Sequence, residues 1–273
     1  MSTLTLTLND DVDYPVDVSD LTPAALEGKS QGEIGRLKVP AGGTRVRVGD
    51  LFAIAGRSGE TLAFEASRGL LEGVGARLEA GSIELTGGAG DGAALEMRGG
   101  SVKIAGGCGD YLGAAMTGGL VAVRGTVGDH AGGALPGRPH GMRGGVVVIS
   151  GRAGDLLANR MRRGTVIVTG NAGAYCGARM IAGTVVVGGA IGPYPGFNAR
   201  RGTLAVAEGA VEVPGYFRDS GPLDSVFVDL LKQHVKRYSP RAAKFVSGAP
   251  ASRLYRGDIA CGGLGELLVF ATS

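Results

Sequence analysis

Residues 97–110 read MRGGSVKIAGGCGD, and three later stretches repeat that pattern: residues 116–129 (MTGGLVAVRGTVGD), 142–155 (MRGGVVVISGRAGD) and 161–174 (MRRGTVIVTGNAGA). Each stretch begins with Met, has a glycine three residues later, continues as a short aliphatic run and ends at further glycines. The stretches follow one another at intervals of 19 residues, except for one step of 26. A regular interval of this length is typical of a protein built from stacked structural repeats.

The repeat extends in both directions and accounts for many of the 52 glycines among the 273 residues. Glycines occupy the same position in seven units: Gly81, Gly100, Gly119, Gly145, Gly164, Gly183 and Gly202. Two and four residues after each of these glycines, the chain carries an aliphatic residue in every unit, such as Val102 and Ile104. Alternation with a period of two, rich in β-branched residues and bounded by glycine, predicts one short, half-buried strand per unit.

A unit with one short strand cannot bury its apolar face alone, so the units are expected to stack. The sequence predicts an all-β solenoid. Specifically, we expect a parallel β-helix of about seven regular 19-residue coils, with an irregular N-terminal cap and a C-terminal cap that contains a helix. Successive coils would rise by about 4.8 Å. Every Met except Met1 occupies one position of the unit, which predicts an interior row of thioethers.

The flanking segments predict three regions: an N-terminal capping segment over 1–42, the repeat domain over 43–209, and the C-terminal cap over 210–273. Alternating leucines at 4, 6 and 8 predict a strand, and apolar residues on one face between 223 and 238 predict a helix that ends before Pro240. The longer step inserts a Pro- and Gly-rich loop over 132–142, where a repeat protein is expected to meet partners.

Composition narrows the functional classes. The 28 basic and 25 acidic residues give a net charge of +3, too balanced for a dedicated nucleic-acid-binding protein. No apolar run reaches the length of a membrane span, and residues 1–13 lack a basic stretch followed by an apolar one, so we expect a cytoplasmic protein. The three cysteines are widely separated and form neither a disulfide framework nor a CxxC site.

No catalytic residue or metal ligand can be assigned from motifs, because GxSxG, HExxH and Walker sequences are absent. Four aspartates follow the second glycine corner of their units, and we expect each to cap its own turn rather than to bind calcium: Asp91, Asp110, Asp129 and Asp155. Val148, Ile167 and Val186 form an exposed apolar stripe on the outer face of the predicted strands. Such a stripe requires cover from the C-terminal segment or from another protein.

Arginines gather at one corner of the predicted stack: Arg143, Arg160, Arg162, Arg163, Arg179, Arg200 and Arg201. Two interpretations remain open. The long side chains can spread into solvent, where counter-ions screen them. Alternatively, the arginines contact an acidic partner or another anion.

The Met-Arg-Gly-Gly units, the GxxGD corners, Val48-Gly-Asp-Leu-Phe52 and Arg256-Gly-Asp-Ile259 resemble the family of the C subunit of formylmethanofuran dehydrogenase, which includes the C subunit of the formyltransferase/hydrolase complex of methylotrophs. The family shares a glycine-rich β-helix with the C-terminal domain of glutamate synthase large subunits. The short, free-standing chain resembles the C subunit more than that domain.

The resemblance implies a non-catalytic scaffold subunit of a complex that moves a formyl group from formyl-tetrahydromethanopterin to a methanofuran-type carrier and releases formate. Its implied partners are amidohydrolase-like and formyltransferase subunits, which perform the chemistry, and this chain itself is expected to bind no cofactor. The acidic tail of the carrier then becomes a candidate partner for the arginines. Two alternatives remain: a stand-alone interdomain module of the glutamate synthase type and an independent β-helical enzyme.

Overall fold

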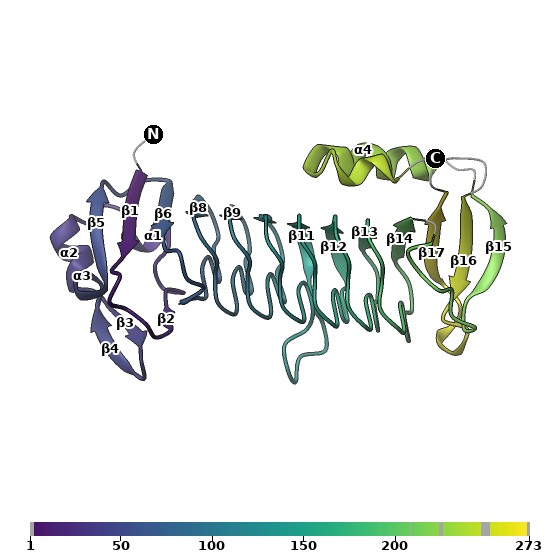
Figure 1. Cartoon of the computed structure of the whole chain (residues 1–273), viewed down its shortest axis with the longest axis horizontal. Coiled ribbons are helices and arrows are strands. Elements are labelled where there is room, and N and C mark those ends of the chain that lie inside the picture. Colours follow the sequence, from purple (N-terminus) through teal and green to yellow (C-terminus); the bar gives the residue numbers. More distant parts are fainter. Residues whose placement is uncertain (1–2, 208, 224–225, 247–251, 272–273) are drawn as a thin grey trace.

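The computed structural model describes residues 3–207, 209–223, 226–246 and 252–271. The molecule is elongated, with strands side by side along its long axis (Figure 1). The N-terminal elements lie at one end of this row and the C-terminal strands at the other.

Eight strands in the middle of the row pair in parallel: β6 (Thr61–Glu65), β8 (Ser82–Leu85), β9 (Ser101–Ile104), β10 (Leu120–Val123), β11 (Arg143–Ile149), β12 (Arg163–Val168), β13 (Thr184–Val187) and β14 (Thr203–Ala207). Their register places aliphatic residues opposite each other, as with Ile83 and Val102. These side chains are buried, so the alternating pattern of the sequence corresponds to the apolar inner face of these strands.

A second line of parallel contacts follows the turns after these strands. Isolated bridges join residues at equivalent positions: Ala89, Cys108, Val127, Ala153, Ala172 and Ile191. The Met row lies inside, because Met97, Met116, Met142, Met161 and Met180 are all buried. The thioethers therefore contribute to the main hydrophobic core.

At the N-terminal end, β1 (Thr3–Leu8) lies between β6, its parallel neighbour, and the antiparallel β5 (Phe52–Gly56). A second sheet has the order β4 (Thr44–Arg47), β3 (Lys38–Ala41), β2 (Val16–Asp17), β7 (Leu71–Glu72). Three short helices complete this end: α1 (Pro23–Leu26), α2 (Gln31–Arg36) and α3 (Val48–Leu51). A capping box in which Ser30 and Glu33 bond reciprocally starts α2.

At the C-terminal end, β17 (Gly265–Phe270) pairs in parallel with β14 and antiparallel with β16 (Arg253–Gly257), which pairs with β15 (Arg218–Pro222). The predicted helix is α4 (Val226–Tyr238). Two 3-10 turns, η1 (Ala242–Lys244) and η2 (Ile259–Cys261), lie in the same region.

The predicted fold class is wrong. The strands do not make a parallel β-helix of seven regular coils: they form one open 13-stranded sheet of mixed direction and a separate four-stranded sheet. The physical reason lies at the two ends of the row of parallel strands, because the outermost strands, β6 and β14, each have one edge that needs a partner. Two strands from outside the repeat supply these partners: β1 pairs in parallel with β6, and β17 pairs in parallel with β14. The antiparallel pairs β1–β5, β16–β17 and β15–β16 then extend the sheet at both ends. A glycine interval of 19 residues carries no information about these additions.

The apolar stripe is not exposed in the folded chain, and of the two expected kinds of cover the C-terminal segment provides it. Val148, Ile167 and Val186 are buried in a second hydrophobic cluster. Val228, Leu231 and Val235 of α4 supply the opposite side of that cluster, with residues of η1 and β17. Figure 1 shows α4 lying along this side of the sheet. The chain therefore covers the stripe with its own C-terminal segment.

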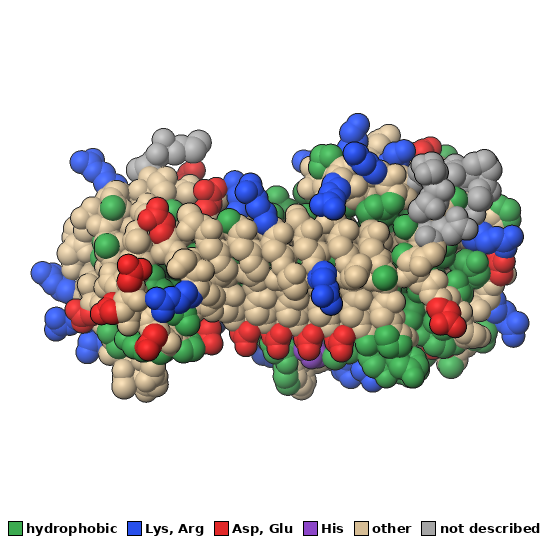
Figure 2. Space-filling model, viewed as in Figure 1, with side chains coloured by type: hydrophobic (Ala, Val, Ile, Leu, Met, Phe, Trp, Pro, Cys, Tyr) green, Lys and Arg blue, Asp and Glu red, His purple; other side chains and the backbone are tan. Residues whose placement is uncertain are grey.

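The aspartates after the second corner link successive units instead of capping their own turns. Each Oδ1 accepts a hydrogen bond from the backbone N–H at the equivalent position in the following unit: Asp91 from Asp110 (2.8 Å), Asp110 from Asp129 (2.7 Å), Asp129 from Asp155 (2.7 Å) and Asp155 from Ala174 (2.7 Å). A row of acidic side chains is visible along the lower edge of the molecule in Figure 2. The expectation of a local cap was wrong, because stacking brings the backbone N–H of the following unit within hydrogen-bond distance of each aspartate.

Candidate functional site

The loop over 132–142 projects from the lower edge of the sheet (Figure 1). Its ends are fixed to the next unit by the backbone: the Ala134 N–H donates to the Asn159 carbonyl at 3.1 Å, and the Gly141 N–H donates to the Arg160 carbonyl at 2.9 Å. Pro136 and Pro139 restrict the backbone between these anchors. The loop is thus held against residues 159 and 160.

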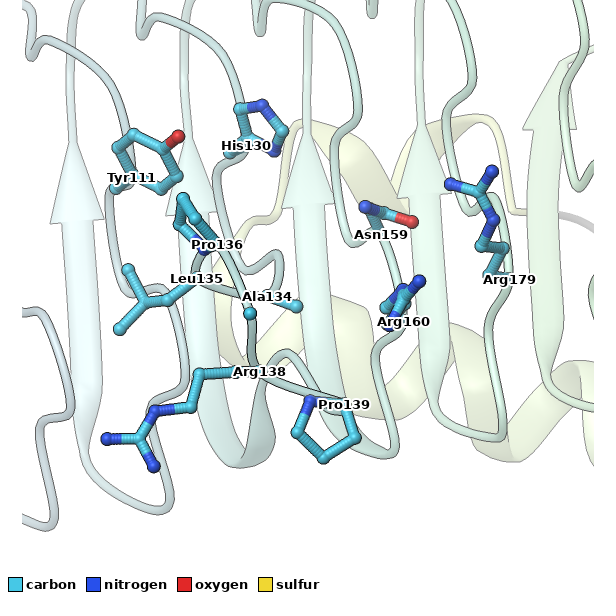
Figure 3. Close-up of a pocket in the computed structure, with 11 residues that line it drawn as sticks. Tyr111, His130, Ala134, Leu135, Pro136, Arg138, Pro139, Asn159, Arg160 and Arg179 are labelled. Carbon is cyan, nitrogen blue, oxygen red and sulfur yellow. The ribbon is translucent and has the colours of Figure 1, made fainter.

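Two neighbouring cavities lie beside this loop. The first, of about 400 Å³, lies among Tyr111, His130, Leu135, Pro136, Arg138, Asn159 and other residues (Figure 3). The second, of about 530 Å³, extends past His140, Ile181, Asn198, Arg200 and Cys261. Both are lined by Pro139, Arg160 and Arg179, so they are parts of one concave surface, which we call the arginine groove.

The arginine groove is cationic. Arg138, Arg160, Arg179 and Arg200 line it, and neither cavity has an Asp or Glu in its lining. None of these four arginines takes part in the ion pairs found within the described residues. A concave surface with several guanidinium groups and no carboxylate concentrates anions. Guanidinium groups also match carboxylates and phosphates geometrically, through paired N–H donors.

Buried polar atoms without a hydrogen-bond partner also gather in this groove. Within the described residues, three buried side-chain atoms lack a partner: His130 Nδ1, His140 Nδ1 and Asn159 Oδ1. All three residues line the groove, and Asn159 is only 7% exposed. Leaving a buried polar atom unpaired costs about 1–3 kcal/mol. These unpaired atoms therefore mark the groove as a candidate binding site.

Known proteins resemble this chain to different extents. No family model matches it. Among curated proteins, the C subunit of the formyltransferase/hydrolase complex Fhc from Methylorubrum extorquens is 42% identical over 83 residues, which is 30% of this chain and 31% of that protein. A solved structure matches much more completely: the formyltransferase/hydrolase complex FhcABCD from Methylorubrum extorquens, in complex with methylofuran. The matched chain is 39% identical with a TM-score of 0.89, and the match covers 98% of this chain and 100% of that one.

The chain belongs to the family of the C subunit of the formyltransferase/hydrolase complex. The resemblance seen in the sequence is therefore confirmed. A match over nearly the whole chain also favours a complex subunit over the glutamate synthase and independent-enzyme alternatives.

In this member of the family, the structure brings together three of the seven arginines singled out from the sequence. Arg160, Arg179 and Arg200 line the groove. The other four lie outside both cavity linings: Arg143, Arg162, Arg163 and Arg201. Arg143 and Arg163 are cross-strand neighbours at the start of β11 and β12.

Sequence reasoning missed Arg138, Asn159, His130 and His140 as members of one site. The inserted loop was the available signal, because insertions into a repeat form loops on one face, which is often the binding face. The side chains that face this surface come from five successive units, from the loop and from Cys261 near the C-terminal end. Their convergence depends on the stacking of those units.

The cysteines provide no reactive centre inside the core. Burial raises the pKa of the Cys108 and Cys176 thiols to about 12. Cys261 lies at the edge of the groove, with its Sγ 3.4 Å from Asn198 Oδ1. Among the described residues, no group of three or more His, Cys, Asp or Glu side chains is arranged to hold a metal ion. No helix among the residues that the structure describes is both long enough and apolar enough to cross a bilayer.

Proposed function

We propose that this chain is a structural, non-catalytic subunit of a cytoplasmic formyltransferase/hydrolase complex. In that complex, a formyl group passes from formyl-tetrahydromethanopterin to a methanofuran-type carrier and is released as formate. The observation that carries the proposal is the match to a chain of FhcABCD over nearly the full length of both chains. Amidohydrolase-like and formyltransferase subunits are the proposed partners, and they would perform the chemistry.

The shape of the chain supports a scaffold role. An elongated open sheet presents long, rigid surfaces on which several proteins can be arranged. Its parallel middle is stabilised by ladder bonds, by a continuous apolar core and by the aspartate links between units. A rigid platform of this kind can hold two catalytic subunits at a fixed separation.

We further propose that the arginine groove holds an acidic group. Arg160 and Arg179 would pair with carboxylates, and Asn159 Oδ1 would accept a hydrogen bond from a donor on the same ligand. An acidic peptide or an amide-linked acidic chain offers both groups. Two sources fit this chemistry: an acidic segment of a neighbouring subunit, or an acidic part of the carrier. The structural relative was solved with methylofuran, which makes the carrier a reasonable second source.

Co-purification tests the proposed function. The tagged chain is expressed together with the formyltransferase and amidohydrolase-like subunits of its own organism, and the eluate is examined by native mass spectrometry. We expect one complex of defined stoichiometry that releases formate from a formylated carrier. Recovery of the tagged chain alone, with the other subunits present in the lysate, would contradict the proposal.

A further inference from the structure

A cluster of exposed apolar side chains lies at the C-terminal end of the molecule, beside the arginine groove. Tyr175, Tyr194, Ile259 and Leu264 are 37%, 51%, 45% and 52% exposed, and we call them the tyrosine face. Hydrophobic side chains gather at the lower right of Figure 2, next to the end of the acidic row. Contiguous exposed apolar groups on a folded protein mark sites of interaction.

A chain of contacts links Tyr175 and Tyr194 to the turn that carries Ile259. The rings of Tyr175 and Tyr194 stack with their centroids 5.0 Å apart, and Phe197 meets Tyr175 edge-on at 6.1 Å. Phe197 in turn contacts Tyr216, whose carbonyl accepts a 3.2 Å hydrogen bond from the Ile259 N–H. The turn that carries Ile259 is therefore joined to the stacked tyrosines, and Leu264 follows it in the chain.

Hydrogen bonds order the tyrosine face and its surroundings in the free chain. The Tyr175 N–H donates to the Pro193 carbonyl at 2.8 Å, and the Tyr216 hydroxyl donates to the Pro195 carbonyl at 3.0 Å. Tyrosine has few rotatable bonds, so an ordered tyrosine surface loses little entropy when it is buried. Preorganisation of this kind favours tight binding.

The charge around the patch differs from one side to the other. On one side the Arg179 N–H donates to the Phe197 carbonyl at 2.7 Å, so the arginine groove borders the patch directly. Cys261, which lies between Ile259 and Leu264 in sequence, lines the groove together with Arg179 and Arg200. On the other side Asp155 accepts a hydrogen bond from the Ala174 N–H, next to Tyr175.

We propose that the tyrosine face binds another subunit of the complex. The partner segment would place an apolar side chain over Tyr175 and Tyr194 and a carboxylate toward Arg179 and Arg200. Tyrosine and arginine are, with tryptophan, enriched at protein–protein binding centres. The guanidinium groups, which have no ion pair within the described residues, select an acidic partner. The proposal rests on the proposed function, because it takes its partner from that complex.

A second copy of this chain is a poorer occupant. A second tyrosine face would bring no carboxylate from its own groove, because neither cavity has an Asp or Glu in its lining. Four arginines without an ion pair within the described residues are better matched by a partner segment that carries carboxylates of its own. The charge of the groove therefore favours a different, acidic protein.

The experiment measures binding of the full chain to the purified formyltransferase and amidohydrolase-like subunits by biolayer interferometry. The test variants are Tyr194→Ser with Leu264→Ser, and separately Ile259→Ser. The matched control is Val226→Ser with Leu230→Ser, which removes apolar side chains that are 74% and 59% exposed on α4. We expect the test variants to weaken binding about tenfold or more while the control binds like the wild type.

The possible results separate the proposals. Thermal melting equal to that of the wild type shows that each variant is folded. If the wild type binds a subunit and both test variants bind it with the same affinity, the tyrosine-face proposal alone is overturned. If the wild type binds neither subunit, the proposed function is overturned as well. Light scattering that shows a dimer of the isolated chain, lost in the test variants, would assign the face to a second copy and also overturn the proposal.

Discussion

The Asp91 carboxylate lies where a side chain at Gly109 would have to be. Its Oδ1 accepts a 2.8 Å hydrogen bond from the Asp110 N–H, and a Cβ built on Gly109 would overlap that same oxygen. Gly128, Gly154 and Gly173 stand in the same relation to Asp110, Asp129 and Asp155. The glycine and the aspartate of these corners therefore depend on each other.

Gly109→Val should lower the free energy of unfolding by about 3 kcal/mol. The cause is overlap of the new side chain with the Asp91 carboxylate, which would also lose its hydrogen bond to the Asp110 N–H. Backbone strain does not contribute, because the φ of Gly109 is not positive. Thermal unfolding followed by circular dichroism measures the effect. Gly215→Val is the matched control, since a Cβ there meets nothing within 4 Å. Equal melting temperatures for the two variants would show that the corner has spare room.

The parallel pairing of strands 19 residues apart could be predicted, because alternating aliphatic residues bounded by glycine specify both the strand and its register. Val102 and Val121 pair in this way. The fold class could not be predicted. Strands β1 and β5 lie outside the repeat, and alternating apolar residues alone do not identify which strand pairs with which. The amphipathic pattern of α4 was sufficient to predict the helix, and the structure adds that it covers Ile167 and Val186.

The arginine groove shows a different limit. Arg160 and Arg179 could be grouped from their spacing, since equivalent positions in neighbouring units become adjacent. Arg138 belongs to the inserted loop, whose path no periodicity specifies. Asn159 was missed because an unpaired buried oxygen is visible only in three dimensions.

Separating α4 from the sheet should expose the second hydrophobic cluster. Leu231→Asp with Val235→Asp places two carboxylates against Ile167 and Val186, and we expect a loss of about 3 kcal/mol or more of stability. An increase in fluorescence of a hydrophobic dye reports the exposed cluster. Lys232→Asp with Lys236→Asp is the control on the exposed face of α4 and should leave dye binding unchanged. A similar increase in both variants would show that charge on α4, rather than detachment, is responsible.

Only Cys261 should react with a thiol reagent at pH 8 in the folded protein. The pKa of the Cys108 and Cys176 thiols is raised to about 12, so both stay protonated, and burial also blocks access. Titration with an aromatic disulfide should give one rapid equivalent, and three after denaturation. Rapid release of three equivalents from the native chain would mean that the core opens readily. Cys261→Ser should abolish the rapid phase.

The isolated chain should not release formate from a formylated carrier. Neither cavity of the arginine groove brings a nucleophile, a base and an orienting group into mutual contact within the described residues. Formate production is measured with the pure chain and, as a positive control, with the co-purified complex. Activity of the pure chain that persists after repeated purification would make it an enzyme in its own right.

Charge reversal in the arginine groove should weaken binding of its acidic ligand. Arg160→Glu with Arg179→Glu replaces two guanidinium groups by carboxylates beside Asn159, so attraction becomes repulsion. We expect about a tenfold or greater loss of affinity at low salt, and a smaller loss near 1 M salt, where charges are screened within about 3 Å. Arg162→Glu with Arg201→Glu makes the same change in net charge outside the cavity linings and serves as the control. Binding to the other subunits and binding to the carrier are measured separately, which identifies the source of the acidic group. If the wild type, the test variant and the control bind the other subunits and the carrier with equal affinity at every salt concentration, the arginines of the groove are ordinary solvent-exposed side chains.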